Sequence, residues 1–230
     1  MPRLLIVTAV PAERDAVLGA WQPTAGQLHG QDLLRAATPA GLVDAVAAGV
    51  GAVAAALGTA ALLPAGYDAV LSAGIAGGFP PAPVGSTAVA DRVAFADLGA
   101  QLSDGGFASL AELGLGEVAD DADPALGRLL AERSGAVTGT VLTVQTVTGT
   151  RARADRLSAA YPDAVAEGME GAGVAAAARR AGVPFGELRT ISNPVGPRDR
   201  ENWHLGPALA ALTAALAAVL AEPLAAPSKG

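Results

Sequence analysis

Short apolar runs of strand length alternate with helix-length segments along nearly the whole chain. Arg3–Ala9 and Asp68–Ala73 are almost continuously apolar, which is typical of strands buried on both faces of a sheet. Strands that alternate with helices pack into one sheet with helices on both faces. The pattern therefore predicts a three-layer α/β fold.

Turn residues and apolar periodicity set the bounds of the other elements. We expect further strands over residues 27–36, 42–48, 86–95, 138–144 and 185–191. We expect helices over residues 11–18, 51–63, 120–132, 151–160 and 169–181, and a last helix that begins near Leu205 and ends before Pro223. We expect a Gly-rich turn at 74–78, a mobile loop at 99–117 and a polar loop at 194–203.

Length and composition favour one compact domain. The chain has 230 residues, of which 51% are hydrophobic, and is long enough for a single large core. We expect one domain over residues 1–230, with a tail over residues 222–230 that frays. The last helix carries its large residues at spacings of three and four with alanine elsewhere, so we interpret it as a packing helix and not a membrane span.

The charge and the lack of cysteine restrict partners and chemistry. The formal net charge is −7 without a block of like charges, so neither nucleic acid nor a membrane is an expected partner. A chain without cysteine has neither disulfides nor thiolate chemistry and fits the cytoplasm. His29 and His204 are the only histidines and are far apart in sequence, so we expect no metal site and no cofactor.

Polar side chains follow several of the expected strands. Glu13 comes just after the first strand, Glu170 lies among small residues in AEGMEGAGVAAAA, and Asn193 ends the strand that contains Arg189. Active sites in open α/β sheets form at such strand ends. Glu13 and Glu170 can also be helix caps, and Arg189 can be the structural ion-pair partner of either. Taken together, the four residues predict a site at this sheet edge.

Four segments resemble the nucleoside phosphorylase and nucleosidase superfamily, and the resemblance covers nearly the whole chain. They are TAVPAE, AAGVGAVAAALGTAALL, LSAGIAGGFPPAPVGSTAVAD and EGMEGAGVAAAARRAGVPFGELRTISN. Within the superfamily, TVQTVTGT, ISNPVGPRDRENW and FADLGAQ resemble the futalosine hydrolases. The resemblance implies an α/β/α sandwich with a central mixed sheet. It also implies a homo-oligomeric cytoplasmic hydrolase that releases hypoxanthine from futalosine, a small nucleoside substrate, in menaquinone biosynthesis.

The resemblance also implies roles for single residues. Glu13 matches the acid that binds and deprotonates the attacking water, and Arg189 matches the arginine beside that water. Met169 and Glu170 match the pair that packs on the ribose and accepts hydrogen bonds from its hydroxyls. Val147 stands where relatives often carry an aromatic residue that stacks on the base; Phe95 and Trp203 are aromatic residues that can compensate.

The Gly-rich segment and Asn193 indicate the nucleophile and the base. Ile75, Ala76 and Gly77 are expected to contact the substrate. Relatives with the sequence GSAGG carry a hydroxyl residue where this chain has Ile75. A phosphate site would lack the hydrogen bond of that hydroxyl. Water is therefore the expected nucleophile. Adenosine-type nucleosidases carry an acid where this chain has Asn193. An amide cannot give N7 of adenine its proton, but it can donate a hydrogen bond to a 6-oxopurine.

Three alternatives remain open at this stage. A purine nucleoside phosphorylase would use phosphate in place of water. A nucleosidase of the methylthioadenosine/S-adenosylhomocysteine type would release adenine. A relative without turnover would only bind its ligand. The residues that hold the carboxyphenyl end of futalosine are not evident, although Arg198 and Arg200 are cations that suit a carboxylate.

Overall fold

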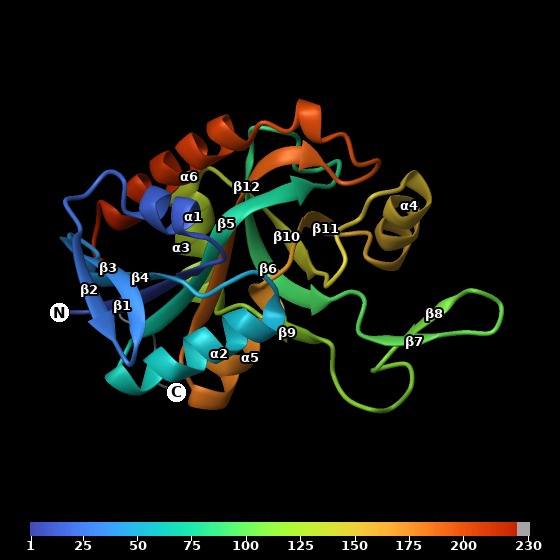
Figure 1. The fold of residues 1–230 in the computed structure, drawn as a ribbon, viewed down its shortest axis with the longest axis horizontal. Coiled ribbons are helices and arrows are strands. Elements are labelled where there is room, and N and C mark those ends of the chain that lie inside the picture. The colour runs from blue at the N-terminus through green and yellow to red at the C-terminus, as the bar shows by residue number, and fades with distance from the viewer. Residues whose placement is uncertain (225–230) are drawn as a thin grey trace.

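A ten-stranded mixed sheet forms the centre of the computed structural model, which describes residues 1–224 (Figure 1). In spatial order its strands are β11 (Ala164–Gly168), β10 (Val137–Thr143), β6 (Thr87–Phe95), β12 (Phe185–Pro194), β5 (Ala69–Gly78), β1 (Arg3–Thr8), β4 (Gly41–Ala47), β3 (Gln31–Thr38) and β2 (Thr24–Leu28). The short strand β9 (Ala119–Asp121) pairs with β6. Parallel pairs such as β1–β5 stand beside antiparallel ones such as β12–β6, which confirms a mixed sheet.

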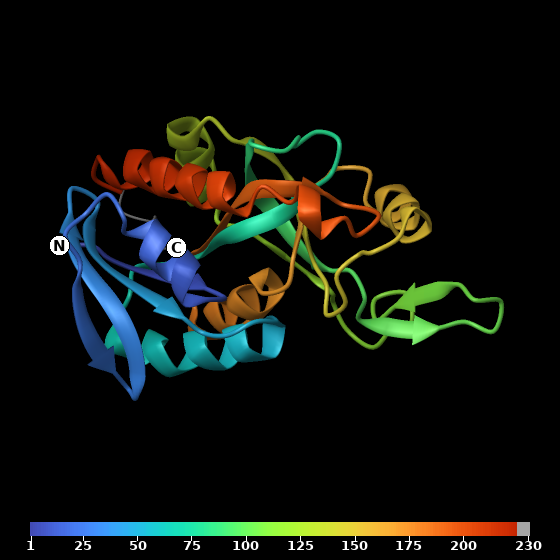
Figure 2. The same ribbon diagram turned by 45° about the horizontal axis from the view of Figure 1, so that its top comes forward.

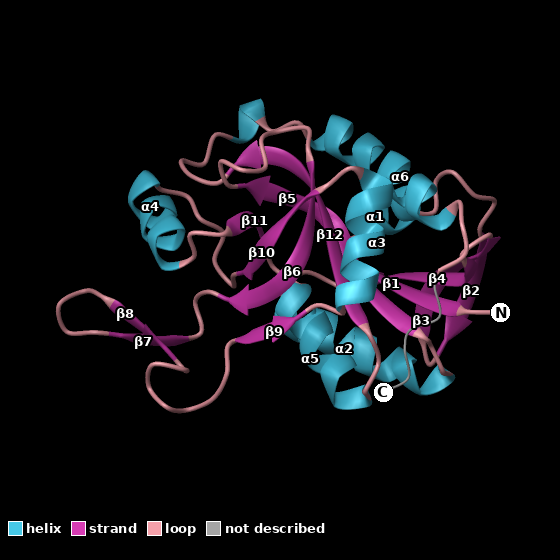
Figure 3. Ribbon diagram, turned by 180° about the vertical axis from the view of Figure 1, so that it is seen from behind, coloured by secondary structure: helices cyan, strands magenta, loops and turns pink. Residues whose placement is uncertain are grey.

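Helices cover both faces of this sheet. One face carries α2 (Ala52–Leu62) and α5 (Gly171–Ala181), and the other carries α1 (Pro11–Val17), α3 (Pro124–Ser134) and α6 (Leu205–Leu220) (Figures 1 and 2). The helix α4 (Arg151–Ala160) lies beyond the ends of β10 and β11 (Figure 3). Two 3-10 turns, η1 (Leu63–Ala65) and η2 (Arg200–Asn202), complete the helical elements of residues 1–224. The predicted three-layer α/β/α sandwich is therefore confirmed.

Apolar cores fill the space between the layers. Ala55 and Ala178 lie in the core under α2 and α5, and Leu130 and Leu216 lie in the core under α1, α3 and α6. The first core is built from small residues, which lets α2 and α5 approach closely. A β-carbon at Gly173 would collide with the backbone of Ala52, so glycine is required at this contact.

Several boundaries differ from the expected ones. The segment 27–36 is not one strand, because β2 and β3 form a hairpin that turns at His29 and Gly30, both with positive φ; this backbone suits a tight hairpin turn. The first two residues of the expected helix 120–132 belong to strand β9. The helix α3 begins after Asp123, which caps the backbone amides of Ala125 and Leu126.

Two segments that were expected to be irregular have regular structure. Gly74–Gly78 is the second half of β5, where it pairs with β12 on one side and with β11 on the other. Glycine lets β5 approach β12 closely here, since a β-carbon at Gly78 would lie 2.6 Å from Cγ2 of Ile191 in β12 and would also collide with the backbone of Ala82 in the following loop. Within Gly99–Glu117, β7 (Gly99–Gln101) and β8 (Phe107–Ser109) form a hairpin that projects from the body (Figure 2).

Hydrogen bonds from α3 hold the segment at and after the end of α6. Arg133 donates hydrogen bonds to the carbonyl oxygens of Val219, Glu222 and Pro223 at 2.8, 3.0 and 3.0 Å. Residues 225–230 of the expected tail lie outside the described residues. Among the helices of the described part, none is long and apolar enough to cross a membrane.

Candidate active site

The carboxyl ends of β1, β5, β11 and β12 bring three of the predicted residues together. Glu13, Glu170 and Arg189 are 4%, 5% and 1% exposed. A β-carbon placed on Gly74 would lie 2.6 Å from Glu13 Oε1 and 2.9 Å from Arg189 Nη1, so both side chains converge on this glycine. Arg189 Nη1 also lies 3.4 Å from Glu170 Oε2. The sheet edge thus holds two carboxylates around one guanidinium, as the sequence predicted.

Backbone amides hold Glu13 in place. Its Oε2 accepts hydrogen bonds from the amides of Ala9 and Val10 at 3.0 and 3.3 Å. Its Oε1 accepts one from the amide of Ile75 at 2.9 Å. Glu13 therefore does accept hydrogen bonds from exposed backbone amides, as the capping interpretation predicts. This role does not exclude chemistry, because an ionised carboxylate has about four lone-pair sites and can accept a further bond.

Glu170 is held more loosely. It accepts hydrogen bonds from the amides of Gly51 at 3.1 Å and of its neighbour Met169 at 3.3 Å, besides the 3.4 Å contact with Arg189. Hydrogen bonds of this type centre near about 2.9 Å, so all three are long. Gly51 has a φ of 95°, which favours glycine at the close approach. Glu170 therefore keeps its capacity to accept strong hydrogen bonds from a ligand.

Arg189 has a closer partner than either predicted one. Its Nε donates to Oε1 of Glu187 at 2.7 Å, and its Nη2 donates to Oγ of Ser72 at 2.9 Å. Burial opposes the charge on Arg189, but Glu187, Glu170 and Glu13 outweigh it and raise the pKa of the guanidinium. Sequence reasoning missed Glu187, although its spacing from Arg189 places both on one face of a strand.

Asn193 lies at a break in the register of β12. Ile191 pairs with Ala76 and Asn193 with Gly77, so one residue bulges between them. Bulges re-aim side chains and are frequent beside active sites. The Asn193 side chain accepts from Oγ of Ser192 at 2.8 Å and donates to the carbonyl of Pro194 at 3.0 Å. Its second amide hydrogen has no partner among the described residues.

Two carboxylates support the loop that contains Val147. Asp97 accepts from the amides of Gln145 and Thr146 at 3.0 and 3.2 Å. Glu167 accepts from the amide and the hydroxyl of Thr148 at 2.9 and 2.5 Å. Burial raises the pKa of Glu167 above its usual value, against the effect of these hydrogen bonds. Val147 lies between these two contacts and is 41% exposed. Like Glu187, Glu167 was not predicted from the sequence.

The remaining predicted residues lie around this group. Ile75 is half-buried and follows Gly74, whereas Ala76 is packed in the core and offers a ligand little side-chain surface. The amide of Arg198 donates to the carbonyl of Gly149 at 3.3 Å, which ties the polar loop to the Val147 loop. The guanidiniums of Arg198 and Arg200 each lie 6.0 Å from the ring of Trp203.

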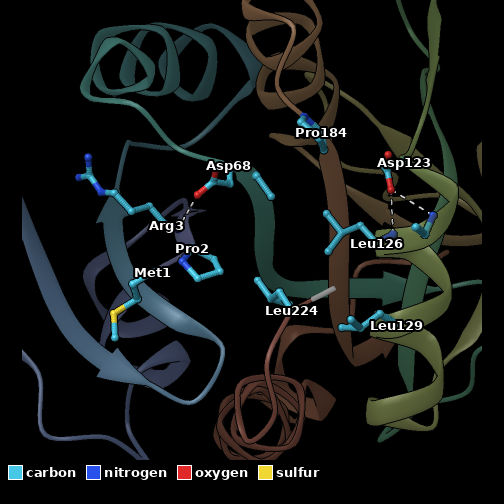
Figure 4. Close-up of a pocket in the computed structure, with 11 residues that line it drawn as sticks. Met1, Pro2, Arg3, Asp68, Asp123, Leu126, Leu129, Pro184 and Leu224 are labelled. Carbon is cyan, nitrogen blue, oxygen red and sulfur yellow. Dashed lines mark hydrogen bonds between the residues drawn. The ribbon is translucent and has the colours of Figure 1, made fainter. Parts of the chain in front are cut away.

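An apolar pocket of about 250 Å³ lies elsewhere, near the amino ends of β1 and β5 (Figure 4). Leu126, Leu129, Pro184 and Leu224 line it, and the polar atoms of Asp68 and Asp123 are occupied by backbone amides. It contains none of the predicted site residues. Among residues 1–224, no group of three or more His, Cys, Asp or Glu side chains is arranged to hold a metal ion.

Comparison with known proteins gives consistent matches. The model of the Phosphorylase superfamily matches residues 3–224. A futalosine hydrolase of Streptomyces coelicolor is 51% identical over 92% of both chains, and one of Acidothermus cellulolyticus is 47% identical over 92% of this chain and 87% of that protein.

Solved structures share the fold at lower identity. A methylthioadenosine/S-adenosylhomocysteine nucleosidase of Colwellia psychrerythraea, in complex with adenine, has a TM-score of 0.81 at 24% identity over 97% of this chain and 98% of that chain. The futalosine hydrolase of Helicobacter pylori has a TM-score of 0.81 at 20% identity over 95% and 97% of the two chains. The family match over nearly the whole chain and the two long sequence matches show that the chain belongs to the Phosphorylase superfamily and, within it, to the futalosine hydrolase family.

Proposed function

We propose that this chain hydrolyses the N-glycosidic bond of futalosine and releases hypoxanthine and dehypoxanthine futalosine. The observation that carries the proposal is the buried group of Glu13, Glu170 and Arg189 in a chain that is 51% identical to a futalosine hydrolase. The proposal includes one domain over residues 1–230 and a place in menaquinone biosynthesis in the cytoplasm, to which a chain without cysteine is suited.

The proposed chemistry assigns one task to each carboxylate. Cleavage of the bond between ribose and base passes through a ribosyl cation with oxocarbenium character. Glu170 accepts hydrogen bonds from the ribose hydroxyls and places negative charge near that cation, while Met169 packs on the sugar. Glu13 binds a water and takes its proton as the water oxygen bonds to the anomeric carbon. The base leaves with the electron pair of the broken bond.

Asn193 is the proposed selector of the base. Its free amide hydrogen can bind O6 or N7 of hypoxanthine, where an ionised aspartate would repel O6. Hypoxanthine is also a better leaving group than adenine and needs less help from an acid. Ile75, Gly77 and Val147 line the same region, and Phe95 or Trp203 supplies the stacking surface that Val147 lacks.

Replacement of Asn193 by Asp tests this selection. We expect Asn193→Asp to lower kcat/KM on futalosine about 10-fold to 100-fold, because a lost hydrogen bond and a new repulsion near O6 together cost about 1.5–3 kcal/mol. Steady-state assays of hypoxanthine release measure the effect. Unchanged kcat/KM would refute the role of Asn193. The control is Gln22→Glu, an exposed amide-to-carboxyl change away from the polar loop.

The reaction itself is tested by base release with and without phosphate. Futalosine, inosine and methylthioadenosine are incubated with the protein in parallel, and free hypoxanthine and adenine are quantified. Phosphate-independent release of hypoxanthine from futalosine is the expected result. A requirement for phosphate would make the chain a phosphorylase, adenine release from methylthioadenosine would make it an adenosine-type nucleosidase, and no release would leave a ligand-binding protein.

We also propose that the protein is a homo-oligomer. Three apolar residues just before α2 and along it are largely exposed: Val50 by 58%, Val53 by 69% and Leu57 by 69%. The spacing of Val53 and Leu57 places them on one face of the helix. An apolar helix face of this kind is typical of an interface. Sedimentation equilibrium should give a mass that is a multiple of 22.5 kDa, and a Val53→Glu, Leu57→Glu variant should shift it to the monomer.

A further inference from the structure

Glu187 is a buried charged group that the chemistry above does not use. It is fully buried in β12, and its Oε2 has no hydrogen-bond partner. We propose that Glu187 is a positioning residue: it orients Arg189 toward the gap between Glu13 and Glu170, and its charge weakens the attraction of Arg189 for both carboxylates. The inference rests on the proposed function, because it concerns the same site.

Two short hydrogen bonds fix the guanidinium from behind. Glu187 and Arg189 lie on the same face of β12, and Glu187 pairs in register with Ser72 of β5. Glu187 holds Nε at 2.7 Å, and Ser72 holds Nη2 at 2.9 Å. Only Nη1 is left to face Glu170 and Gly74, and its contact with Glu170 is the long one, at 3.4 Å. The anchored side of Arg189 therefore faces the sheet and the free side faces the ligand.

Two glycines on either side of Met169–Glu170 make room for this arrangement. A β-carbon at Gly171 would collide with Oε2 of Glu187, and one at Gly168 would lie 3.3 Å from Cζ of Arg189. The sequence GMEG thus carries the proposed ribose-binding pair between Gly171, where a side chain would collide with Glu187, and Gly168, where one would press on Arg189. The glycines and Glu187 form one packed unit.

The second proposed effect of Glu187 is that its charge weakens the attraction between Arg189 and the two other carboxylates. Three carboxylates share one cation, and burial raises the pKa of Glu187 while Arg189 opposes that rise. The elements that pack on α1 are α6, β4, β1 and β5. Among these, α6 and β5 contain no charged residue, while β4 and β1 contain Asp44 and Arg3, which pair with each other. Besides Arg189, the charged group of the site that accompanies Glu13 is Glu170, at the start of α5. If Glu187 were neutral, Arg189 would attract ionised Glu13 and Glu170 more strongly. A carboxylate that a cation holds more tightly accepts a proton from water less readily.

The Glu187→Gln variant separates charge from shape. It keeps an oxygen for Nε of Arg189 but removes the negative charge. We expect kcat on futalosine to fall about 10-fold, and the acid limb of kcat/KM to move about one pH unit toward lower pH. Ser72→Ala loosens the same guanidinium without removing a charge, so it should lower kcat and leave the acid limb in place. Asp32→Asn removes an exposed carboxylate on β3, outside the site, and should leave both unchanged.

A direct titration keeps this test separate from the test of the proposed function. Carbon-13 NMR of the glutamate carboxyl groups, with the Glu13 signal identified by its loss in Glu13→Gln, should show a lower Glu13 pKa in Glu187→Gln than in the unmodified protein. An unshifted Glu13 titration would overturn the role of Glu187 even if futalosine is hydrolysed, whereas absence of hydrolysis with a shifted titration would overturn only the proposed function. If Glu187→Gln does not fold, Gly171→Ala, which displaces the same carboxylate, must lower kcat, and full activity of it would refute the proposal.

Discussion

Replacement of Glu13 by glutamine should lower kcat on futalosine about 10³-fold, within the range by which positioned general bases contribute. The substitution keeps the size of the side chain but removes the group that takes a proton from water. It also replaces one of the two acceptor oxygens by an NH2 donor, so at least one of the backbone hydrogen bonds of Glu13 is lost. Binding should change little, because the ribose is assigned to Glu170 and Met169 and the base to Asn193. Single-turnover kinetics give the chemical step, and isothermal titration gives the affinity of the inactive variant for intact substrate.

The control for Glu13→Gln lies in the same helix. Asp15→Asn removes the same charge two residues further along α1, where the side chain is 59% exposed and pairs with Arg14. It should change kcat less than twofold, since exposed ion pairs contribute about 0–1 kcal/mol. A Glu13→Gln variant that retains more than a tenth of the original kcat would leave Glu13 with its capping role only, because its three backbone hydrogen bonds do not depend on catalysis.

The layers, and the placement of Glu13 and Glu170 around Arg189, could be predicted from the sequence because they depend on local patterns. An apolar run predicts a buried strand, and a polar residue directly after such a strand lies at the end of the sheet regardless of how the other elements pack. Glu13 and Glu170 follow this rule, whereas Arg189 lies inside β12 and was found because a buried charge needs a partner. The segment Gly74–Gly78 did not follow the rule, because glycine is a turn signal in sequence. In the structure the segment is part of β5, and Gly78 packs against Ile191 of β12, a requirement that is visible only in three dimensions.

The missed residues depend on contacts between distant segments. Glu187 lies in the same strand as Arg189. Its pairing with Arg189 can be recognised only in the folded structure, where Ser72 and Gly171 lie against the pair. Glu167 is separated by 19 residues from the loop that it supports at Thr148. A charge inside an apolar strand is the signal that could have found Glu187, since burial of a charge requires a partner. No comparable local signal marks the supporting role of Glu167.

Among the described ion pairs outside the site, substitution of Asp44 should cause the largest decrease in the free energy of unfolding. Asp44 is fully buried in β4 and accepts hydrogen bonds from Arg35 at 2.6 and 2.8 Å and from the hydroxyl of Tyr67 at 2.6 Å, with Arg3 nearby at 3.5 Å. Removal of one partner from a buried pair costs about 3–5 kcal/mol. Because the arginines are partly exposed and can be hydrated, we expect Asp44→Asn to lower the free energy of unfolding by about 3 kcal/mol. Asp32→Asn, an exposed change on neighbouring β3, should cost less than about 0.5 kcal/mol.

The pH dependence of this loss has a definite sign. Burial alone would raise the pKa of Asp44, but the hydrogen bonds from Arg35 and Tyr67 outweigh it and hold that pKa below its usual value. A carboxyl whose pKa is lowered by folding stabilises the protein above its unfolded pKa of about 3.9, and this stabilisation is lost as the pH falls through the folded pKa. The difference in unfolding free energy between the unmodified protein and Asp44→Asn, measured by urea denaturation, should therefore be constant from pH 7 to pH 5 and narrow on further acidification. A difference that stays constant down to pH 3 would show that Asp44 contributes through packing and not through its charge.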